Sequence, residues 1–319
     1  MICLIKLNKK MSRIDKLKEQ HPELNVSVID LLSKVDPTDS YKYTEFLIKK
    51  LKESYPDSTI VSLDNYFTGK EENHISGVEY YHGHTWEADH IFRDREFDTV
   101  FHFGEYSRIV KSFEDIDFVH RSILSGTPII LELCRKWGAK LIYSASSSKF
   151  GNAGKDENLS PYSWMKSKMV ELIKNYGDWY GLNYEICYFF NVYGPSQITT
   201  GDYATVIGIF ERQYRAGELL TVVSPGTQTR DFTHIYDIVS GLIKAAEKDP
   251  AMNHEWHLRS GTNVSMIELA NMFNSAYTLI PERMGERFAS EEFPSDTETL
   301  LEWKPINNLN DWINNIITE

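Results

Sequence analysis

A tyrosine and a lysine four residues apart are the first candidates for chemistry in this sequence. Tyr162 and Lys166 lie in Pro161-Tyr162-Ser163-Trp164-Met165-Lys166, and proline suits the first turn of a helix. Residues four apart project from one helical face, so the ammonium is expected beside the phenol. A neighbouring positive charge lowers the pKa of a phenol, which makes tyrosine a usable acid or base near neutral pH. Such a pair also arises by chance, so it needs support from a second element.

A run of hydroxyl groups before that helix supplies the support. Ser144-Ala145-Ser146-Ser147-Ser148 follows a short apolar run at 140–143. Serine hydroxyls at this point could orient a substrate oxygen toward the tyrosine. The two segments together predict an acid–base site.

The elements that must position this site alternate between two kinds. Short β-rich runs at 59–63, 98–103, 140–144 and 184–190 are separated by helical patterns. This alternation predicts a parallel sheet covered on both faces. Functional sites in such sheets lie at the carboxyl ends of the strands, which is where the candidate residues fall. After about Thr199 the pattern becomes irregular, as expected for a smaller C-terminal lobe that closes over a substrate.

Bulk composition narrows the classes of partner. The 319 residues carry a net charge of -12 without a clustered basic segment, which argues against nucleic-acid binding. No apolar run approaches the roughly 20 residues that span a bilayer, and the N-terminal apolar stretch is too short for a signal peptide. Cys3, Cys134 and Cys187 have no metal-type spacing and cannot all pair. We therefore expect reduced thiols in a cytoplasmic protein without membrane or nucleic-acid partners.

Further motifs give the sequence a definite resemblance. It is similar to extended short-chain dehydrogenase/reductases of the NAD-dependent epimerase/dehydratase family, the group containing UDP-galactose 4-epimerase-like enzymes. Besides the tyrosine helix, the matching motifs are Leu63-Asp64-Asn65-Tyr66-Phe67-Thr68-Gly69, Phe101-His102-Phe103, Ser146-Ser147-Ser148-Lys149-Phe150-Gly151, Phe190-Asn191-Val192-Tyr193-Gly194-Pro195, Thr229-Arg230-Asp231-Phe232-Thr233-His234-Ile235-Tyr236-Asp237-Ile238, Arg283-Met284-Gly285-Glu286 and Leu301-Glu302-Trp303-Lys304-Pro305.

The resemblance implies an α/β fold, a Rossmann-like doubly wound parallel sheet with a smaller C-terminal substrate-binding lobe. We expect residues 1–38 to form an N-terminal extension of uncertain structure. Residues 39–190 would form the Rossmann-like cofactor domain. Residues 191–319 would be mainly substrate lobe, with some elements returning to the sheet.

The same resemblance implies catalytic and cofactor roles. Tyr162 would remove the proton of a sugar hydroxyl, Ser146 would share that proton, and Lys166 would hold the nicotinamide ribose of NAD. Asp64, next to Asn65, would bind the adenosine ribose, although a strand-end turn residue is an equally plain interpretation of this aspartate. A carboxylate there repels a 2'-phosphate, which favours NAD over NADP. His102 and Phe190 match positions beside the cofactor.

A nucleotide-diphosphate sugar is the substrate that the resemblance implies. The candidate substrate-binding residues are Ser147, Ser148, Asn191, Arg230, Arg283 and Glu286. Arg230 could instead be a surface salt-bridge partner of Asp231. The helical stretches at 113–137 and 162–180 pair across a two-fold axis in the family, which implies a homodimer, unless they only cover the sheet.

One half of the expected cofactor site departs from the family pattern. Between Met1 and Ser58 the sequence has no glycine, although a pyrophosphate approaches backbone only where side chains are absent. The loop would fall on residues 39–43, ahead of an intact helical pattern at 44–53. We also assign three further departures to the adenosine side: Gly83-His84-Thr85, Gly104-Glu105 and Ile123. The chain either holds NAD in an unusual way or has lost tight cofactor binding.

The residues after Ser146 bear on the reaction. Dehydratases of the family have an Asp-Glu pair there, because elimination of water needs a carboxylic acid near the leaving hydroxyl. Decarboxylases of the family have a glutamate there. Serines at these two positions favour epimerisation at C4 of the sugar. A keto-sugar-nucleotide reductase and a non-catalytic sugar-nucleotide binding protein are the alternatives.

Overall fold

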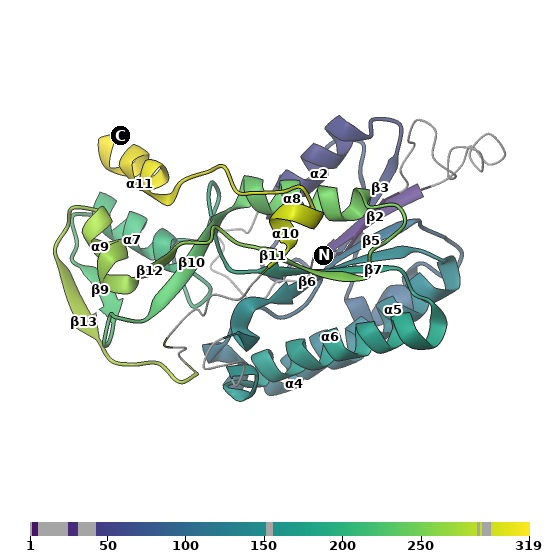
Figure 1. Cartoon of the computed structure of the whole chain (residues 1–319), viewed down its shortest axis with the longest axis horizontal. Helices are drawn as coiled ribbons and strands as arrows, with labels where there is room; N and C mark the ends of the chain where they lie inside the picture. Colours follow the sequence, from purple (N-terminus) through teal and green to yellow (C-terminus); the bar gives the residue numbers. More distant parts are fainter. Residues whose placement is uncertain (1, 6–24, 31–42, 151–155, 286–287, 289–294) are drawn as a thin grey trace.

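An eight-stranded sheet forms the centre of the larger lobe (Figure 1). The computed structural model of the chain describes residues 2–5, 25–30, 43–150, 156–285, 288 and 295–319. The strand order is β11-β7-β6-β5-β1-β2-β3-β4, and every recorded pairing is parallel except those of β1 with β2 and with β5. The strands are β1 (Ile2–Ile5), β2 (Asn25–Asp30), β3 (Thr59–Asp64), β4 (Glu79–His82), β5 (Thr99–Phe103), β6 (Lys140–Ser146), β7 (Tyr184–Phe189) and β11 (His254–Leu258). The predicted parallel sheet is therefore confirmed.

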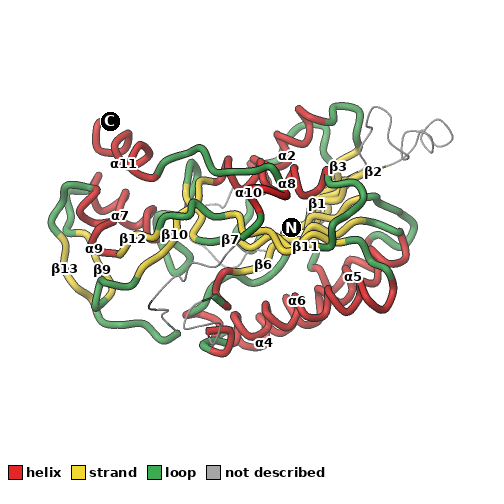
Figure 2. Tube along the Cα trace, in the orientation of Figure 1, coloured by secondary structure: helices red, strands yellow, loops and turns green. Residues whose placement is uncertain are grey.

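The interior strands are apolar on both sides because helices cover both faces. In β6, Leu141 and Tyr143 pack into one core and Ile142 into the other, as the two-residue period of a strand requires. Figure 2 shows the strands side by side with helices on both sides of the sheet. No face is left to water, which explains why the strands read as apolar runs in the sequence.

Two groups of helices make these layers. Below the sheet in Figure 1 lie α4 (Ile116–His120), α5 (Gly126–Trp137) and α6 (Pro161–Tyr180). Above it lie α2 (Tyr43–Ser54) and α8 (Ile235–Glu247), with α10 (Thr297–Leu300) beside β11. The shorter elements are η1 (Glu71–Asn73), η2 (Thr85–Glu87), α3 (Ala88–Ile91), η3 (Val110–Phe113), the π-helical η4 (Arg121–Ser125), η5 (Ser147–Lys149) and η7 (Asp156–Asn158). None of the helices in the described ranges is long and apolar enough to cross a membrane.

The smaller lobe, at the left of Figure 1, has its own core. It contains a three-stranded sheet in the order β12-β10-β8 and a two-stranded sheet of β13 and β9. Its elements are β8 (Asn191–Tyr193), α7 (Val206–Arg215), β9 (Leu220–Val223), β10 (Thr229–His234), β12 (Asn263–Ser265), α9 (Met266–Met272), β13 (Tyr277–Ile280) and α11 (Leu309–Thr318). Between these, α8 and β11 return to the large sheet, so the chain crosses between the lobes several times.

The N-terminal part of the chain contributes strands to the large sheet. Residues 2–5 and 25–30, which we expected in an extension of uncertain structure, form β1 and β2. β2 runs parallel to β3 and β5, and the helical pattern predicted at 44–53 is α2. Residues 39–42 of the predicted cofactor loop lie outside the described residues.

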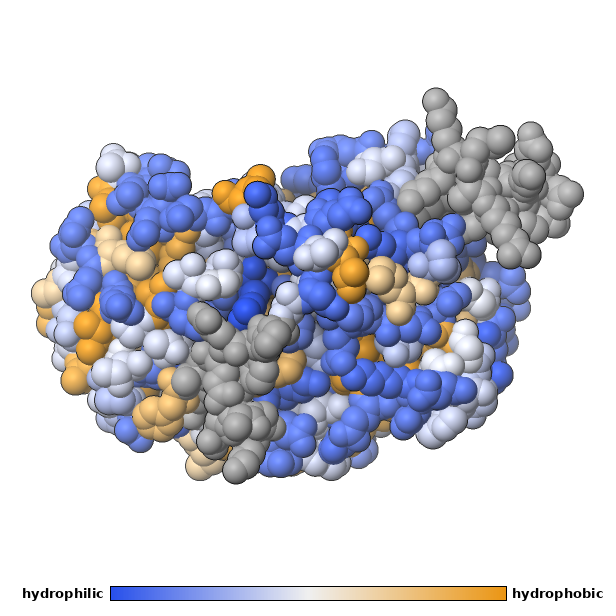
Figure 3. Space-filling view, viewed as in Figure 1, coloured by the Kyte–Doolittle hydropathy of each residue, from blue (hydrophilic) through white to orange (hydrophobic). Residues whose placement is uncertain are grey.

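The face of the molecule in Figure 3 is mostly hydrophilic, with small apolar patches on both lobes. This distribution agrees with the net charge of -12 and with the burial of most large apolar side chains in the three cores.

Candidate active site

The start of α6 carries two of the predicted catalytic residues. Ser160 caps the helix by accepting a hydrogen bond from Ser163 N at 3.1 Å, and Pro161 takes the first helical position. Tyr162 and Lys166 are 8% and 4% exposed, whereas Trp164 between them is 41% exposed. The spacing of four therefore brings the phenol and the ammonium onto the inward face of α6, as the sequence predicts.

The serines stand at the carboxyl end of β6. Ser146 ends the strand and caps η5, with its hydroxyl accepting a hydrogen bond from Ser148 N at 3.2 Å. Its own O–H can therefore be directed at a ligand. Ser147 and Ser148 are buried, and Ser148 Oγ has no hydrogen-bond partner within the part of the chain that the structure describes. A buried hydroxyl without a partner is costly, so it suits a site where a ligand supplies the missing partner.

Lys166 is held by groups from two strands. Its Nζ donates to Ser144 O at 2.5 Å, forms an ion pair with Glu105, and lies 4.3 Å from the centre of the Tyr143 ring. Burial lowers the pKa of Lys166, and the Glu105 carboxylate opposes that effect. The ammonium is thus part of a buried ion pair and not a solvated charge.

Glu105 was missed as a functional residue by the sequence reasoning. Our assignment of the Gly104-Glu105 departure to the adenosine side is wrong, because the structure places the Glu105 carboxylate against Lys166. The physical reason is local: β5 ends at Phe103, a turn follows in which Glu105 N donates to Phe103 O at 2.8 Å, and β6 is the adjacent strand. The available signal was an acidic residue directly after a buried strand, which needs a partner wherever it is enclosed.

Asp64 ends β3 at the same edge of the sheet. Burial raises the pKa of this 7% exposed carboxyl, and Tyr66 N donates to its Oδ1 at 2.8 Å. A Cβ at Gly69 would lie 2.5 Å from Asp64 Oδ2, so only glycine leaves that oxygen room. Asn65 accepts from Phe67 N at 3.2 Å, and its amide nitrogen lies 3.2 Å from His84 Nδ1.

The two remaining predicted cofactor residues lie in different surroundings. His102 has no exposed surface, its Nε2 lies 2.9 Å from Thr127 Oγ1, and burial lowers its pKa well below the usual value. Phe190 follows β7 and stacks on Phe150, with ring centres 6.4 Å apart. His257 on β11 packs beside both rings. A place for His102 and Phe190 beside NAD stays a prediction.

Asn191 and Arg230, two of the predicted substrate residues, lie in the smaller lobe. Asn191 donates to Asp231 O at 3.0 Å, which joins β8 to β10. Arg230 donates to Thr229 O at 2.8 Å, while the Asp231 carboxylate accepts from Ser260 N and Gly261 N.

The remaining predicted substrate residues are Arg283 and Glu286. Arg283 is exposed, and the nearby Gly285 comes close to Phe113 of η3 in the larger lobe. Glu286 lies outside the described residues. The ligand roles predicted for these side chains stay predictions.

Comparison with known proteins identifies the family. The model of the NAD dependent epimerase/dehydratase family matches residues 45–258. The chain belongs to this family. Two relatives are UDP-glucuronic acid decarboxylase 3 of Arabidopsis thaliana and a putative UDP-glucose 4-epimerase of Methanocaldococcus jannaschii. The first is 30% identical over 63% of this chain and 62% of its own length. The second is 31% identical over 62% of this chain and 68% of its own length.

Two further findings limit what these similarities show. The matches to three Arabidopsis UDP-glucuronic acid decarboxylases span 62%, 63% and 62% of their lengths. Among solved structures, UDP-glucose 4-epimerase of Thermotoga maritima superposes with a TM-score of 0.79 at 21% identity, covering 91% of this chain and 98% of that one. The same enzyme of Thermus thermophilus, in complex with NAD, gives 0.77 at 20% identity, with the same coverage. At these identities the superpositions show the fold.

NAD is the cofactor of this family, and the described residues fit it at both ends. Asp64 presents a buried carboxylate at the carboxyl end of β3, with Gly69 leaving its outer oxygen uncovered by a side chain. At the other end, Tyr162 and Lys166 lie together on the inward face of α6. The chemistry of these donors and acceptors suits a ribose at each end of a dinucleotide.

Proposed function

We propose that this chain is a nucleotide-sugar epimerase that inverts C4 of the sugar. The observation that carries the proposal is the sequence Ser146-Ser147-Ser148 at the end of β6, beside the Tyr162/Lys166 helix. Elimination of water requires a carboxylic acid near the leaving hydroxyl, and the two positions after Ser146 offer hydroxyls instead. Epimerisation needs only removal and return of the hydroxyl proton and of the hydrogen on the same carbon.

The described residues support this chemistry in separate roles. NAD, when bound, supplies an acceptor and donor of hydride. Tyr162 would take the proton of the sugar hydroxyl and later return it. Ser146 would hold the same oxygen with the O–H that its backbone contact leaves available. Lys166 would stabilise the Tyr162 phenolate, because a positive charge beside a phenol favours its ionised form.

A nucleotide-diphosphate sugar is the proposed substrate class. Asn191 and Arg230 lie at the start of the smaller lobe, and the segment with Arg283 returns to the larger lobe near Phe113. Arginines in this arrangement suit a diphosphate, since the guanidinium fork matches phosphate oxygens. Ser147 and Ser148 would contact the sugar.

One experiment tests the activity and separates the alternatives. Purified protein is incubated with UDP-glucose, UDP-galactose, UDP-N-acetylglucosamine or UDP-glucuronate, with and without added NAD, and products are read by proton NMR. We expect interconversion of C4 epimers, abolished in Tyr162→Phe. Release of carbon dioxide would show decarboxylation, and a 4-keto-6-deoxy product would show dehydration, in place of the proposed epimerisation. Absence of turnover, with no dinucleotide released on denaturation, would favour a binding protein.

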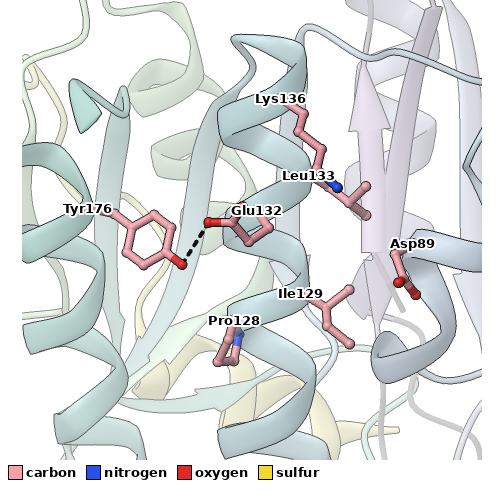
Figure 4. Close-up of a pocket in the computed structure, with 7 residues that line it drawn as sticks. All are labelled: Asp89, Pro128, Ile129, Glu132, Leu133, Lys136 and Tyr176. Atoms are coloured by element: carbon pink, nitrogen blue, oxygen red, sulfur yellow. Dashed lines mark hydrogen bonds between the residues drawn. The ribbon is translucent and has the colours of Figure 1, made fainter. Parts of the chain in front are cut away.

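We also propose a homodimer through α5 and α6. A groove between these helices and α3 is lined by Pro128, Ile129 and Leu133 with charged side chains around them, and Tyr176 donates to Glu132 across it at 2.9 Å (Figure 4). The full lining is Asp89, Pro128, Ile129, Glu132, Leu133, Lys136 and Tyr176. An apolar floor with acidic and basic side chains around it is self-complementary, which suits the two-fold pairing of one copy with another.

A reducing, cytoplasmic location is the remaining proposal. Cys3, Cys134 and Cys187 are unpaired and buried. Burial raises the pKa of each thiol, which keeps it in its unreactive protonated form.

A further inference from the structure

Glu105 is an acidic residue inside the catalytic region for which the family resemblance supplies no role. Its side chain is 2% exposed. It accepts hydrogen bonds from Tyr143 Oη at 2.9 and 3.1 Å, from Thr127 Oγ1 and from Lys166 Nζ. The donors come from β6, α5 and α6, so the carboxylate joins three elements at the carboxyl edge of the sheet. Three donors on one carboxylate fix its position between these elements.

We propose that Glu105 is a positioning residue that holds the Lys166 ammonium beside Tyr162 and keeps it charged within the buried site. Its action on the reaction passes through Lys166, since Glu105 itself is enclosed behind that side chain.

The hydrogen bonds of Lys166 fix the direction of its charge. An ammonium has three N–H groups. One points to Glu105 and one to Ser144 O at 2.5 Å, so the directions of two are set by groups that belong to β6 and to the turn after β5. No third acceptor for this ammonium is recorded among the described residues, so one N–H is left for the face of the Tyr143 ring or for a ligand. A lysine stem is flexible, and these two anchors remove that freedom.

Glu105 also balances the charge of the buried Lys166 ammonium. Burial alone favours a neutral lysine. The titratable groups around Lys166 are Glu105 and Tyr143, which contact it, His102 on β5, whose pKa its charge lowers, and Tyr162, four residues earlier on α6. Burial, and next the Glu105 charge, raise the pKa of Tyr143 well above the usual value, so this phenol stays a donor. His102 stays neutral for the reason given above. Of these groups, Glu105 is the one that forms an ion pair with Lys166, and its carboxylate opposes the effect of burial on the pKa of Lys166.

The substitution that isolates this charge is Glu105→Gln. Glutamine keeps the size of the side chain and an oxygen that can accept from Tyr143, but it removes the charge. The readout is the titration of Lys166 by NMR in protein with 13C-labelled lysine, with its signal assigned from Lys166→Met. We expect Lys166 of the wild type to stay charged at neutral pH, and its titration midpoint to fall by about one unit or more in Glu105→Gln. Equal midpoints in the two proteins would overturn the proposal.

Glu255→Gln is the matched control. Glu255 also joins a lysine and a tyrosine, through contacts with Lys174 and with Tyr188 Oη, but on β11 and with a side chain that is 30% exposed. Its substitution should leave the Lys166 midpoint unchanged, and an equal fall in this variant would also overturn the proposal. Should Glu105→Gln fail to fold, Glu105→Asp is measured instead. It keeps the charge at a greater distance from Lys166 and should lower the midpoint by a smaller amount. A midpoint equal to that of the wild type would contradict us.

The consequence for turnover rests on the proposed function, whereas the lysine titration does not. In Glu105→Gln the alkaline limit of kcat/KM should move down by the same amount as the Lys166 midpoint. The KM for the sugar nucleotide should change little, since Glu105 contacts Lys166 and not the sugar. An alkaline limit that stays in place would refute the role in turnover. If the wild type turns over no nucleotide sugar but the Lys166 midpoint still falls in Glu105→Gln, the epimerase proposal fails. The positioning of Lys166 by Glu105 is then still supported.

Discussion

His257 should make the protein sensitive to mild acid. It lies on β11 with its ring stacked on Phe150 at 5.0 Å, and its Nδ1 is buried without a hydrogen-bond partner among the described residues. Burial, and next the charge of Arg259, lower the pKa of His257 to about 4 from an ordinary value of 6.5. Protonation at this position therefore costs folding free energy.

The sign and size of this change in folding free energy follow from the linkage between protonation and folding. A histidine whose folded pKa is depressed contributes stability that is complete above 6.5 and is lost as pH falls toward 4. Each unit of pKa difference corresponds to about 1.4 kcal/mol. Between pH 7.5 and pH 5.0, integration over the two protonation equilibria gives a loss of about 2 kcal/mol from this residue alone.

Urea unfolding at pH 7.5 and pH 5.0 measures this loss, with tryptophan fluorescence and far-UV circular dichroism as paired probes. His257→Phe keeps an aromatic ring against Phe150 and should lose about 2 kcal/mol less than the wild type between the two pH values. His102 and His234 stay in both proteins, so their acid sensitivity cancels in the difference. His90→Gln, at an exposed position, is the control and should behave as the wild type. Equal losses in His257→Phe and the wild type would refute the reasoning.

Three further predictions concern the site and the interface. Tyr162→Phe should lower turnover by about 10²–10⁴-fold with an unchanged thermal midpoint, because it removes the proton acceptor and keeps the ring; a rate near the wild-type value would assign the proton to another group. Asp64→Asn should weaken NAD binding by about tenfold or more in calorimetry, while raising stability at pH 7. Burial raises the pKa of this carboxyl in the folded protein. Above that pKa the folded protein buries a charged carboxylate, which lowers the free energy of unfolding. Below the pKa of the unfolded chain the group is protonated in both states and has no such effect. Ile129→Lys should convert the proposed dimer to a monomer in light scattering, whereas Leu219→Lys, at a 54% exposed position of the smaller lobe, should not.

Most of the large sheet could be predicted from sequence because its strands are buried on both faces. The runs at 59–63, 98–103, 140–144 and 184–190 became β3, β5, β6 and β7 with ends shifted by one or two residues. β1 is different: four residues do not define a strand by pattern, and only pairing with β2 and β5 identifies it. The smaller lobe was predicted only as an irregular region, because its strands β8, β9, β12 and β13 are three or four residues long.

The arrangement of the candidate catalytic residues could be predicted because their spacing is local. A helix places Tyr162 and Lys166 on one face whatever the rest of the chain does, and Ser146 follows from the end of a recognisable strand. Glu105 could not be placed in this way. Its contact with Lys166 joins residues 61 positions apart, and depends on which way the turn after β5 directs one side chain. A sequence motif carries no information on that direction.

The departures from the family pattern therefore do not all concern one half of the cofactor. Ile123 has no exposed surface and belongs to the apolar core, and the neighbouring Ser122 accepts a hydrogen bond from Tyr106 N at 2.7 Å. A polar group at 123 would thus lie among the apolar side chains of this core. The polar partner of Lys166 comes from the turn after β5 instead, in the form of a carboxylate. Lys166 is therefore anchored by two groups of the protein, the Glu105 carboxylate and Ser144 O.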